Sequence, residues 1–319
     1  MATVSGKGGE NMKRRKKGSE ESSRVIVGRG ERIFRVINNC FMVLLMLITL
    51  YPLLYVLFAS LSDPVEFGKV TGLLWKPAGF STRGYEAVLN SENIWLGFRN
   101  TIFYVVVGTL CSMTITVLGA YPLSRKGFLL KKPIMLFIIF TMFFSGGMVP
   151  TFLVVQKLGL TNTIWAMIIP GMLSVYNMIV LRTSFESVPE SLYESAALDG
   201  ANHFTMLTKI TLPLSKAALA TITLFYAVGK WGEWYNALVY LQKRRDLYPL
   251  QMFLRELLVK QEDMDALLSS SVGVAADSVL LHEIIKYATI IVTTVPILLV
   301  YPFLQKYFVK GVLVGSVKE

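Results

Sequence analysis

Cysteine, histidine and charged residues are all scarce in this 319-residue sequence. The two cysteines, Cys40 and Cys111, lie inside apolar runs, so no disulfide framework is expected. The two histidines, His203 and His282, are far apart, and no cluster of residues has the spacing of metal ligands. We therefore expect neither a metal site nor a disulfide-stabilised fold.

Sequence signatures of catalysis are also missing. There is no Gly-x-Ser-x-Gly motif, no paired histidine and no pair of aspartates in facing apolar segments, so an intramembrane enzyme is not favoured. There is no G-x-x-x-x-G-K-[ST] phosphate loop, so this chain is not expected to hydrolyse ATP itself. The sequence predicts a protein that is not an enzyme and that binds no cofactor of its own.

What the sequence has in abundance is apolar residues. They make up 53% of the chain against 17% charged residues, whereas soluble domains carry about a quarter charged. Six apolar segments approach the length of about 20 residues that crosses a bilayer. We predict an all-α membrane protein with six transmembrane helices, at about Val36–Ser60, Phe98–Leu123, Pro133–Val155, Thr163–Leu181, Ala217–Leu241 and Ile284–Phe308.

The N-terminal 30 residues form a polar, basic segment that includes Lys13–Lys17. Its composition predicts a disordered tail, and residues 31–319 are predicted to form the transmembrane domain. The net charge of +11 could suggest nucleic acid, but the tail has no interleaved aromatic residues. A basic tail directly before an apolar helix instead indicates a cytoplasmic N-terminus.

The short loops support this orientation. Residues 124–132 are basic, and Arg125 and Lys126 among them are interpreted as ordinary cytoplasmic charges, whereas residues 156–162 are nearly uncharged. Both termini are then predicted to be cytoplasmic. Residues 243–245 are basic on the predicted outer side and count against this orientation.

A segment of about 27 residues, 187–213, joins the fourth and fifth apolar segments and is predicted to be a helical hairpin. Ser187 and Glu190 have the spacing of a capping box. Gly200 is predicted to end the first helix, and Asn202 to cap a second one that runs through Lys209.

The first helix of this hairpin has one apolar face, formed by Leu192, Tyr193, Ala196 and Ala197. Two interpretations are open on physical grounds alone. The helix could lie on the membrane surface, or it could dock on a cytoplasmic partner. A surface anchor usually has a lysine-rich polar face, which is absent here.

The hairpin resembles the EAA signature of bacterial ABC importer permeases. The resemblance lies in Glu194-Ser-Ala-Ala-Leu-Asp-Gly200, then nine residues, then Ile210-Thr-Leu-Pro213. It implies that docking to an ATPase involves Glu194, Ser195, Ala196, Ala197, Asp199, Gly200, Ile210, Leu212 and Pro213. Ser195 stands where the family commonly has alanine, and serine is equally small.

The resemblance also implies a fold and a set of partners. The fold would be that of a type I ABC importer, in a bacterial cell membrane. A second, usually different permease would complete the pathway, two ATPase subunits would bind ATP and magnesium, and an extracellular sugar-binding protein would deliver substrate. Phe144–Pro150 and Tyr248–Gln251 resemble the subgroup that handles complex oligosaccharides.

A candidate substrate pathway lies in the fifth apolar segment. Aromatic and polar groups suited to a sugar gather there in Trp231, Glu233, Trp234, Tyr235 and Asn236, and a weaker patch follows from Tyr176 and Asn177. On a continuous helix, Trp231, Trp234 and Tyr235 would share one face. The alternatives are an aromatic belt at the membrane interface, pairing of Glu233 with Lys230, and a hydrogen bond from Asn177 to a neighbouring helix.

The main rival function is a secondary active transporter without an ATPase partner. Such a protein is expected to have an inverted internal repeat and acidic residues near the midplane. This sequence has no obvious repeat, and Glu233 is its one acid deep in an apolar segment. Both features favour the importer permease.

Overall fold

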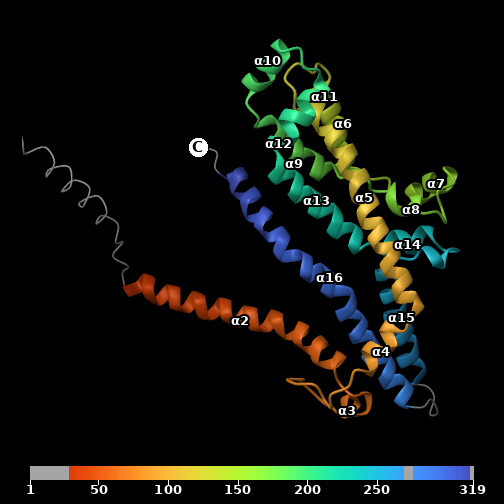
Figure 1. The fold of residues 1–319 in the computed structure, drawn as a ribbon. Coiled ribbons are helices and arrows are strands. Elements are labelled where there is room, and N and C mark those ends of the chain that lie inside the picture. The colour runs from red at the N-terminus through yellow and green to blue at the C-terminus, as the bar shows by residue number, and fades with distance from the viewer. Residues whose placement is uncertain (1–28, 269–275, 317–319) are drawn as a thin grey trace, which may run out of the picture. The chain divides into compact units, whose positions relative to one another are not determined.

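The computed structural model describes residues 29–268 and 276–316 of the chain (Figure 1). The elements, in order, are α2 (Arg29–Ser60), α3 (Pro64–Gly68), α4 (Arg83–Leu89), α5 (Glu92–Ser124), α6 (Lys131–Phe143), α7 (Met148–Lys157), α8 (Trp165–Ile168), α9 (Val175–Glu186), α10 (Glu190–Leu198), α11 (His203–Met206), η1 (Leu207–Thr211), α12 (Leu212–Leu214), α13 (Lys216–Trp231), α14 (Tyr235–Tyr240), η2 (Arg245–Leu247), α15 (Leu250–Leu268) and α16 (Ala276–Ser316). Over these residues the fold is helical without strands, which confirms the predicted class.

The chain divides into two units, Met1–Leu54 and Tyr55–Glu319. The first contains most of α2, which is apolar and carries Pro52 near its end. The predicted tail, residues 1–30, lies almost wholly outside the described residues. All sites discussed below belong to the second unit.

Helix α5 is the central element of the second unit, packed against α8, α9, α13 and α15 (Figure 1). Its buried surface is made largely of small and hydroxyl-bearing residues, among them Gly97, Gly108, Ser112, Thr116 and Ala120. Small residues allow helix backbones to approach closely in a membrane, where apolar side chains alone do not drive association. This composition explains how α5 contacts several neighbouring helices at once.

Three described helices are long and apolar enough to cross a membrane, namely Gly30–Ser60, Glu92–Ser124 and Leu280–Val300. Two bent pairs raise the number to five, with bends of 113° between α6 and α7 and 85° between α12 and α13. The predicted fourth segment does not form one long helix but folds as α8 and α9. The count of six continuous spans is therefore not reproduced.

The helix breaks have local causes. Gly147, before α7, adopts φ +84°, and Gly171, between α8 and α9, adopts φ +71°, values that glycine tolerates best. Pro170 removes a backbone donor beside Gly171. The expected continuous helix over Ala217–Leu241 was wrong, because α13 ends at Trp231 and α14 begins only at Tyr235.

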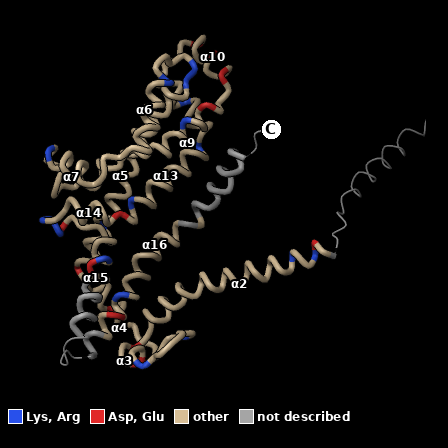
Figure 2. The backbone as a smooth tube through the Cα atoms, turned by 180° about the vertical axis from the view of Figure 1, so that it is seen from behind, with Lys and Arg blue, Asp and Glu red and all other residues tan. Residues whose placement is uncertain are grey.

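Figure 2 shows charged residues of the second unit around α9 and α10 at one end and around α3 and α4 at the other. A further group lies between them, at the end of α13 and around α14 and α15, while most of α5 carries no charge. A long uncharged helix of this kind is expected of an element that crosses hydrocarbon.

Candidate functional site

The hairpin between α9 and α13 has the reversal expected from its sequence. Gly200 adopts φ +77°, its N–H donates to Ala197 O at 3.0 Å, and the N–H of Ala201 donates to Ala196 O at 2.9 Å. These two bonds and the left-handed glycine constitute a Schellman motif. The prediction that Gly200 ends the first helix is confirmed.

The second helix of the hairpin also begins as expected. Asn202 Oδ1 accepts a hydrogen bond from Thr205 N at 2.8 Å and caps α11. The chain then continues as a π-helical turn, Leu207–Thr211, into α12. The helical course is thus longer than the predicted end at Lys209.

The predicted capping box at the start of the hairpin was wrong. Ser187 Oγ donates to Ser184 O at 2.7 Å, and the residue that precedes α10 is Pro189, which has no cap bond. Glu190 Oε1 instead accepts from Arg125 Nη2 at 2.7 Å. A charged donor from the residue that follows α5 has replaced the local backbone amide as the partner of this carboxylate.

The residues assigned to docking lie at the tip of the second unit, on and after α10 (Figure 1). Among them, Glu194, Ser195, Ala197, Asp199, Gly200 and Pro213 are exposed, whereas Ala196, Ile210 and Leu212 are half-buried. Two apolar side chains that the motif did not single out are also presented, since Leu198 is 90% exposed and Phe204 is 70% exposed. The exposed surface of this hairpin therefore combines acidic, small and large apolar residues.

The hairpin rests on a buried cluster that includes Met178, Leu181, Phe185, Tyr193 and Ile222. This cluster joins α9, α10 and α13 and also includes residues of α5, so the hairpin is packed on α5 and on the helices that lead into and out of it. It is not a flexible loop above the membrane domain.

A polar ion-pair cluster lies at the same end of the molecule. Lys131 Nζ and Arg182 Nη2 each contact Glu186 Oε1 at 2.6 Å. Burial raises the pKa of the Glu186 carboxyl, but hydrogen bonds from Lys131 and Arg182 outweigh it and hold the pKa below its usual range. Glu186 is therefore ionised at neutral pH and links α6 to the end of α9.

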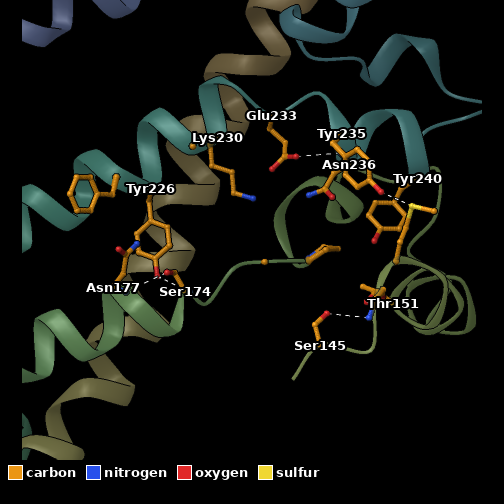
Figure 3. Close-up of a pocket in the computed structure, with 16 residues that line it drawn as sticks. Ser145, Thr151, Ser174, Asn177, Tyr226, Lys230, Glu233, Tyr235, Asn236 and Tyr240 are labelled. Atoms are coloured by element: carbon orange, nitrogen blue, oxygen red, sulfur yellow. Dashed lines mark hydrogen bonds between the residues drawn. The ribbon is translucent and has the colours of Figure 1, made fainter. Parts of the chain in front are cut away.

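The second candidate site is a cavity of about 620 Å³ (Figure 3). Its lining comes from the breaks between α6 and α7, between α8 and α9, and between α13 and α14. The lining residues are Ser145, Gly147, Met148, Thr151, Pro170, Gly171, Ser174, Asn177, Phe225, Tyr226, Gly229, Lys230, Glu233, Tyr235, Asn236 and Tyr240. Non-helical backbone is tolerated at membrane depth where it lines a cavity, and three breaks meet here.

Tyr226 organises one wall of the cavity. Its hydroxyl lies 2.7 Å from Thr116 Oγ1 of α5 and accepts a hydrogen bond from Ser174 N at 3.1 Å. Ser174 Oγ in turn accepts from Asn177 N at 3.3 Å and caps α9. The start of α9 is thereby joined through α13 to α5.

Two charges face the cavity from the end of α13 and the turn that follows it (Figure 3). Lys230 is 6% exposed, and its Nζ donates to Met167 O at 2.9 Å. Glu233 Oε1 accepts from Asn236 N at 3.3 Å, at the start of α14. An ammonium group has three donors, so Lys230 retains capacity for a ligand in the cavity.

The structure brings together some of the predicted pathway residues and separates others. Glu233, Tyr235, Asn236 and Asn177 all line the cavity. Trp231, Trp234 and Tyr176 do not appear in its lining. The break after Trp231 removes the helical face on which Trp231, Trp234 and Tyr235 were expected to lie together.

The two tryptophans make other contacts. Trp231 Nε1 donates to Thr293 O at 3.3 Å, and its ring packs edge-on against Phe98 at 6.3 Å between centroids. Arg255 Cζ lies 5.1 Å from the ring centroid of Trp234. Lys230 and Tyr226 are among the lining residues that sequence reasoning did not select. For Lys230 the available signal was a cationic residue within an apolar segment.

Comparison with known proteins agrees with this architecture. Residues 115–314 match the family of binding-protein-dependent transport system inner membrane components. The chain belongs to this family. The matched residues of this inner membrane transport component include both the hairpin and the cavity, and the resemblance noted in the sequence is confirmed.

Individual relatives cover nearly the whole chain of this transport component. The polygalacturonan/rhamnogalacturonan transport system permease protein YtcP of Bacillus subtilis is 39% identical over 90% of this chain and 99% of its own length. The arabinooligosaccharides transport system permease protein AraQ of Halalkalibacterium halodurans is 27% identical over 85% of this chain and 92% of its own. A chain from the crystal structure of a bacterial ABC transporter involved in the import of the acidic polysaccharide alginate aligns with a TM-score of 0.78 and 34% identity, covering 88% of this chain and 98% of that one.

Proposed function

We propose that this chain is one permease subunit of an ATP-driven importer that carries an oligosaccharide into the cell. The observation that carries the proposal is the rigid, exposed hairpin at one end of the helices that surround the cavity. Its tip presents Glu194, Asp199 and Leu198 to a partner while its base is packed on α9 and α13. The family and the named relatives support transport of sugar polymers or their fragments.

In this proposal the hairpin faces the cytoplasm and docks on an ATPase subunit. A second, different permease would complete the pathway, two ATPase subunits would supply the energy, and an extracellular binding protein would deliver the sugar. Both termini would then be cytoplasmic, and the chain itself would catalyse no reaction. The absence of a phosphate loop from the sequence fits a division of labour between subunits.

The cavity supports a narrower statement on the substrate. Tyrosine, asparagine and serine side chains match sugar hydroxyls, and the buried Lys230 ammonium suits a carboxylate on the sugar. Two of the proteins similar to this one are named for polygalacturonan and for alginate, the latter described as acidic. We propose an acidic oligosaccharide as the substrate class, with the cavity as its route.

The experiment compares variants of the docking hairpin in the complex purified from native membranes. Glu194→Lys and Gly200→Val are expected to abolish ATP-driven uptake and stimulated ATP hydrolysis, while the chain still inserts. Valine at the left-handed φ of +77° costs about 1–2 kcal/mol and projects a branched side chain from the tip. Co-purifying subunits identified by mass would name the ATPase.

Gly127→Val is the matched control, because a Cβ at Gly127 also meets open space but Gly127 has no left-handed φ. It is expected to transport normally. Normal uptake by both hairpin variants would contradict the docking assignment. Uptake driven by an ion gradient, without any ATPase in the preparation, would favour a secondary transporter.

A further inference from the structure

Arg125 was interpreted as an ordinary cytoplasmic charge, but in the structure it packs against the hairpin. It follows the last residue of α5 in an extended conformation, with φ −79° and ψ 144°. Its side chain is only 17% exposed and turns toward the hairpin. Lys126, the next basic residue, is exposed.

The Arg125 guanidinium makes two contacts with one face of α10. Nη2 lies 2.7 Å from Glu190 Oε1, and Cζ lies 3.5 Å from the centroid of the Tyr193 ring. Glu190 and Tyr193 are three residues apart and therefore adjacent on the helix surface. A planar guanidinium can stack on an aromatic ring and pair with a carboxylate at the same time, which an ammonium cannot do equally well.

The contact continues into the second arm of the hairpin. Tyr193 is 2% exposed, and its hydroxyl lies 2.9 Å from Thr211 Oγ1. Thr211 Oγ1 also donates to Met206 O at 3.2 Å, which joins the π-helical turn to α11. Arg125 is thus connected through Tyr193 to both helical arms.

In the other direction along the chain, Arg125 directly follows α5, and α5 extends to the cavity. Thr116, nine residues earlier, bonds the cavity residue Tyr226. Gly108, 17 residues earlier, lies against the stem of Lys230, since a Cβ placed there would be 3.3 Å from Lys230 Cδ. At 1.5 Å per residue these points are about 14 Å and about 26 Å from Arg125 along the helix.

We propose that Arg125 is a positioning residue that fastens the docking hairpin to α5, so that a displacement of the hairpin moves α5 and the cavity wall with it. Rigid elements joined by specific contacts are the physical means by which distant sites are coupled. The proposal rests on the function proposed above, because it requires an ATPase that acts on the hairpin. Without Arg125 the hairpin would keep its attachment through α9 and α13 and its apolar contacts with α5, such as the Tyr121 ring against His203, but it would lose the ion pair and would move α5 less.

The test measures the substrate moved per ATP hydrolysed by the complete transporter in proteoliposomes. Arg125→Gln is expected to retain assembly and stimulated hydrolysis, while transport per ATP falls by about fivefold or more, the lower end of typical coupling between sites. Arg125→Lys is expected to lie between, because it keeps the charge but loses the stacked plane. Exchanging the pair, Arg125→Glu with Glu190→Arg, is expected to restore part of the ratio.

Lys126→Gln is the matched control, because it removes one basic residue from the same loop without touching α10. An unchanged ratio in Arg125→Gln, or an equal loss in Lys126→Gln, would overturn the proposal. If Arg125→Gln fails to assemble, Glu190→Gln decides, since it removes the charge that Arg125 contacts and leaves the guanidinium in place, and an unchanged ratio there overturns the proposal too. A wild-type complex that shows no ATP-driven uptake would refute the proposed function itself.

Discussion

Lys230, which lines the cavity, extends from α13 across Gly108 of α5 to the carbonyl of Met167 in α8. A glycine at position 108 leaves room for the lysine stem, so the placement of the charge depends on a residue of another helix. A buried ammonium is costly in a membrane and is usually functional when it lines a cavity. These features make Lys230 the residue whose change is most informative about substrate class.

At this scale we predict that Lys230→Met weakens transport of an acidic oligosaccharide. A hydrogen bond to a charged group contributes about 1.5–3 kcal/mol, so apparent affinity is expected to fall by about ten- to a hundredfold. Methionine preserves the length and the packing of the stem. Uptake of a charged and a neutral oligosaccharide of equal size, measured side by side, checks the prediction.

The glycines of α5 provide a control for this prediction. A Cβ at Gly108 would lie 3.3 Å from the Lys230 stem, and one at Gly119 would lie 3.3 Å from Met178 Sδ. Gly108→Ala should therefore change acidic-substrate uptake more than Gly119→Ala does. Equal effects of both, or no effect of Lys230→Met, would show that Lys230 has only a structural role.

Between elements, the break after α13 assigns different roles to neighbouring aromatic residues. Trp231 packs on Phe98 and bonds Thr293 O of α16, whereas Tyr235 lines the cavity at the start of α14. The turn of three residues that separates the two helices directs these side chains to different surroundings. One segment thus supplies both packing and pathway groups.

We predict that Trp231→Ala lowers thermal stability, while transport per assembled complex is kept. Truncating a buried aromatic costs up to about 3–5 kcal/mol, and less is expected here because Trp231 is half-buried. Tyr235→Ala is expected to reduce transport with little change in melting temperature. The prediction is checked by measuring thermal unfolding and uptake for both variants. Loss of transport without loss of stability in Trp231→Ala would place Trp231 in the pathway.

For the whole molecule, the distribution of basic residues bears on which end faces the cytoplasm. The hairpin end carries Arg125, Lys126 and Lys131, but the opposite part carries Lys243 and Arg244. The basic residues there are partly neutralised, since Arg244 contacts Asp246 at 2.8 Å and Arg245 contacts Glu256 at 2.6 Å. Acidic residues contribute little to the orientation rule, so Lys243 and Arg244 still count as basic residues on the proposed outer side.

We predict that a membrane-impermeant thiol reagent added outside intact cells labels Lys243→Cys but not Lys126→Cys. Both positions are exposed. The measurement requires a chain without Cys40 and Cys111, which can be replaced by serine and alanine. Labelling of both positions after the membrane is opened is the control, and labelling of Lys126→Cys alone in intact cells would reverse the proposed orientation.

The sequence by itself determined the features whose causes are local. Gly200 and Asn202 terminate and cap neighbouring helices through bonds that span at most five residues, so the hairpin could be predicted from its own residues. The apolar segments likewise follow from composition over about 20 residues. The family signature lies in the same short stretch, which is why family and fold class were accessible together.

Only the tertiary structure decided which partner each polar group takes. Glu190 was expected to bond a nearby amide, but Arg125, 65 residues away, provides a charged donor at 2.7 Å. The faces of Trp231 and Trp234 depended on a break at Gly232 that periodicity does not reveal. The cavity requires three breaks from separate segments to meet, and such an assembly arises from packing between helices, which no single stretch of sequence encodes.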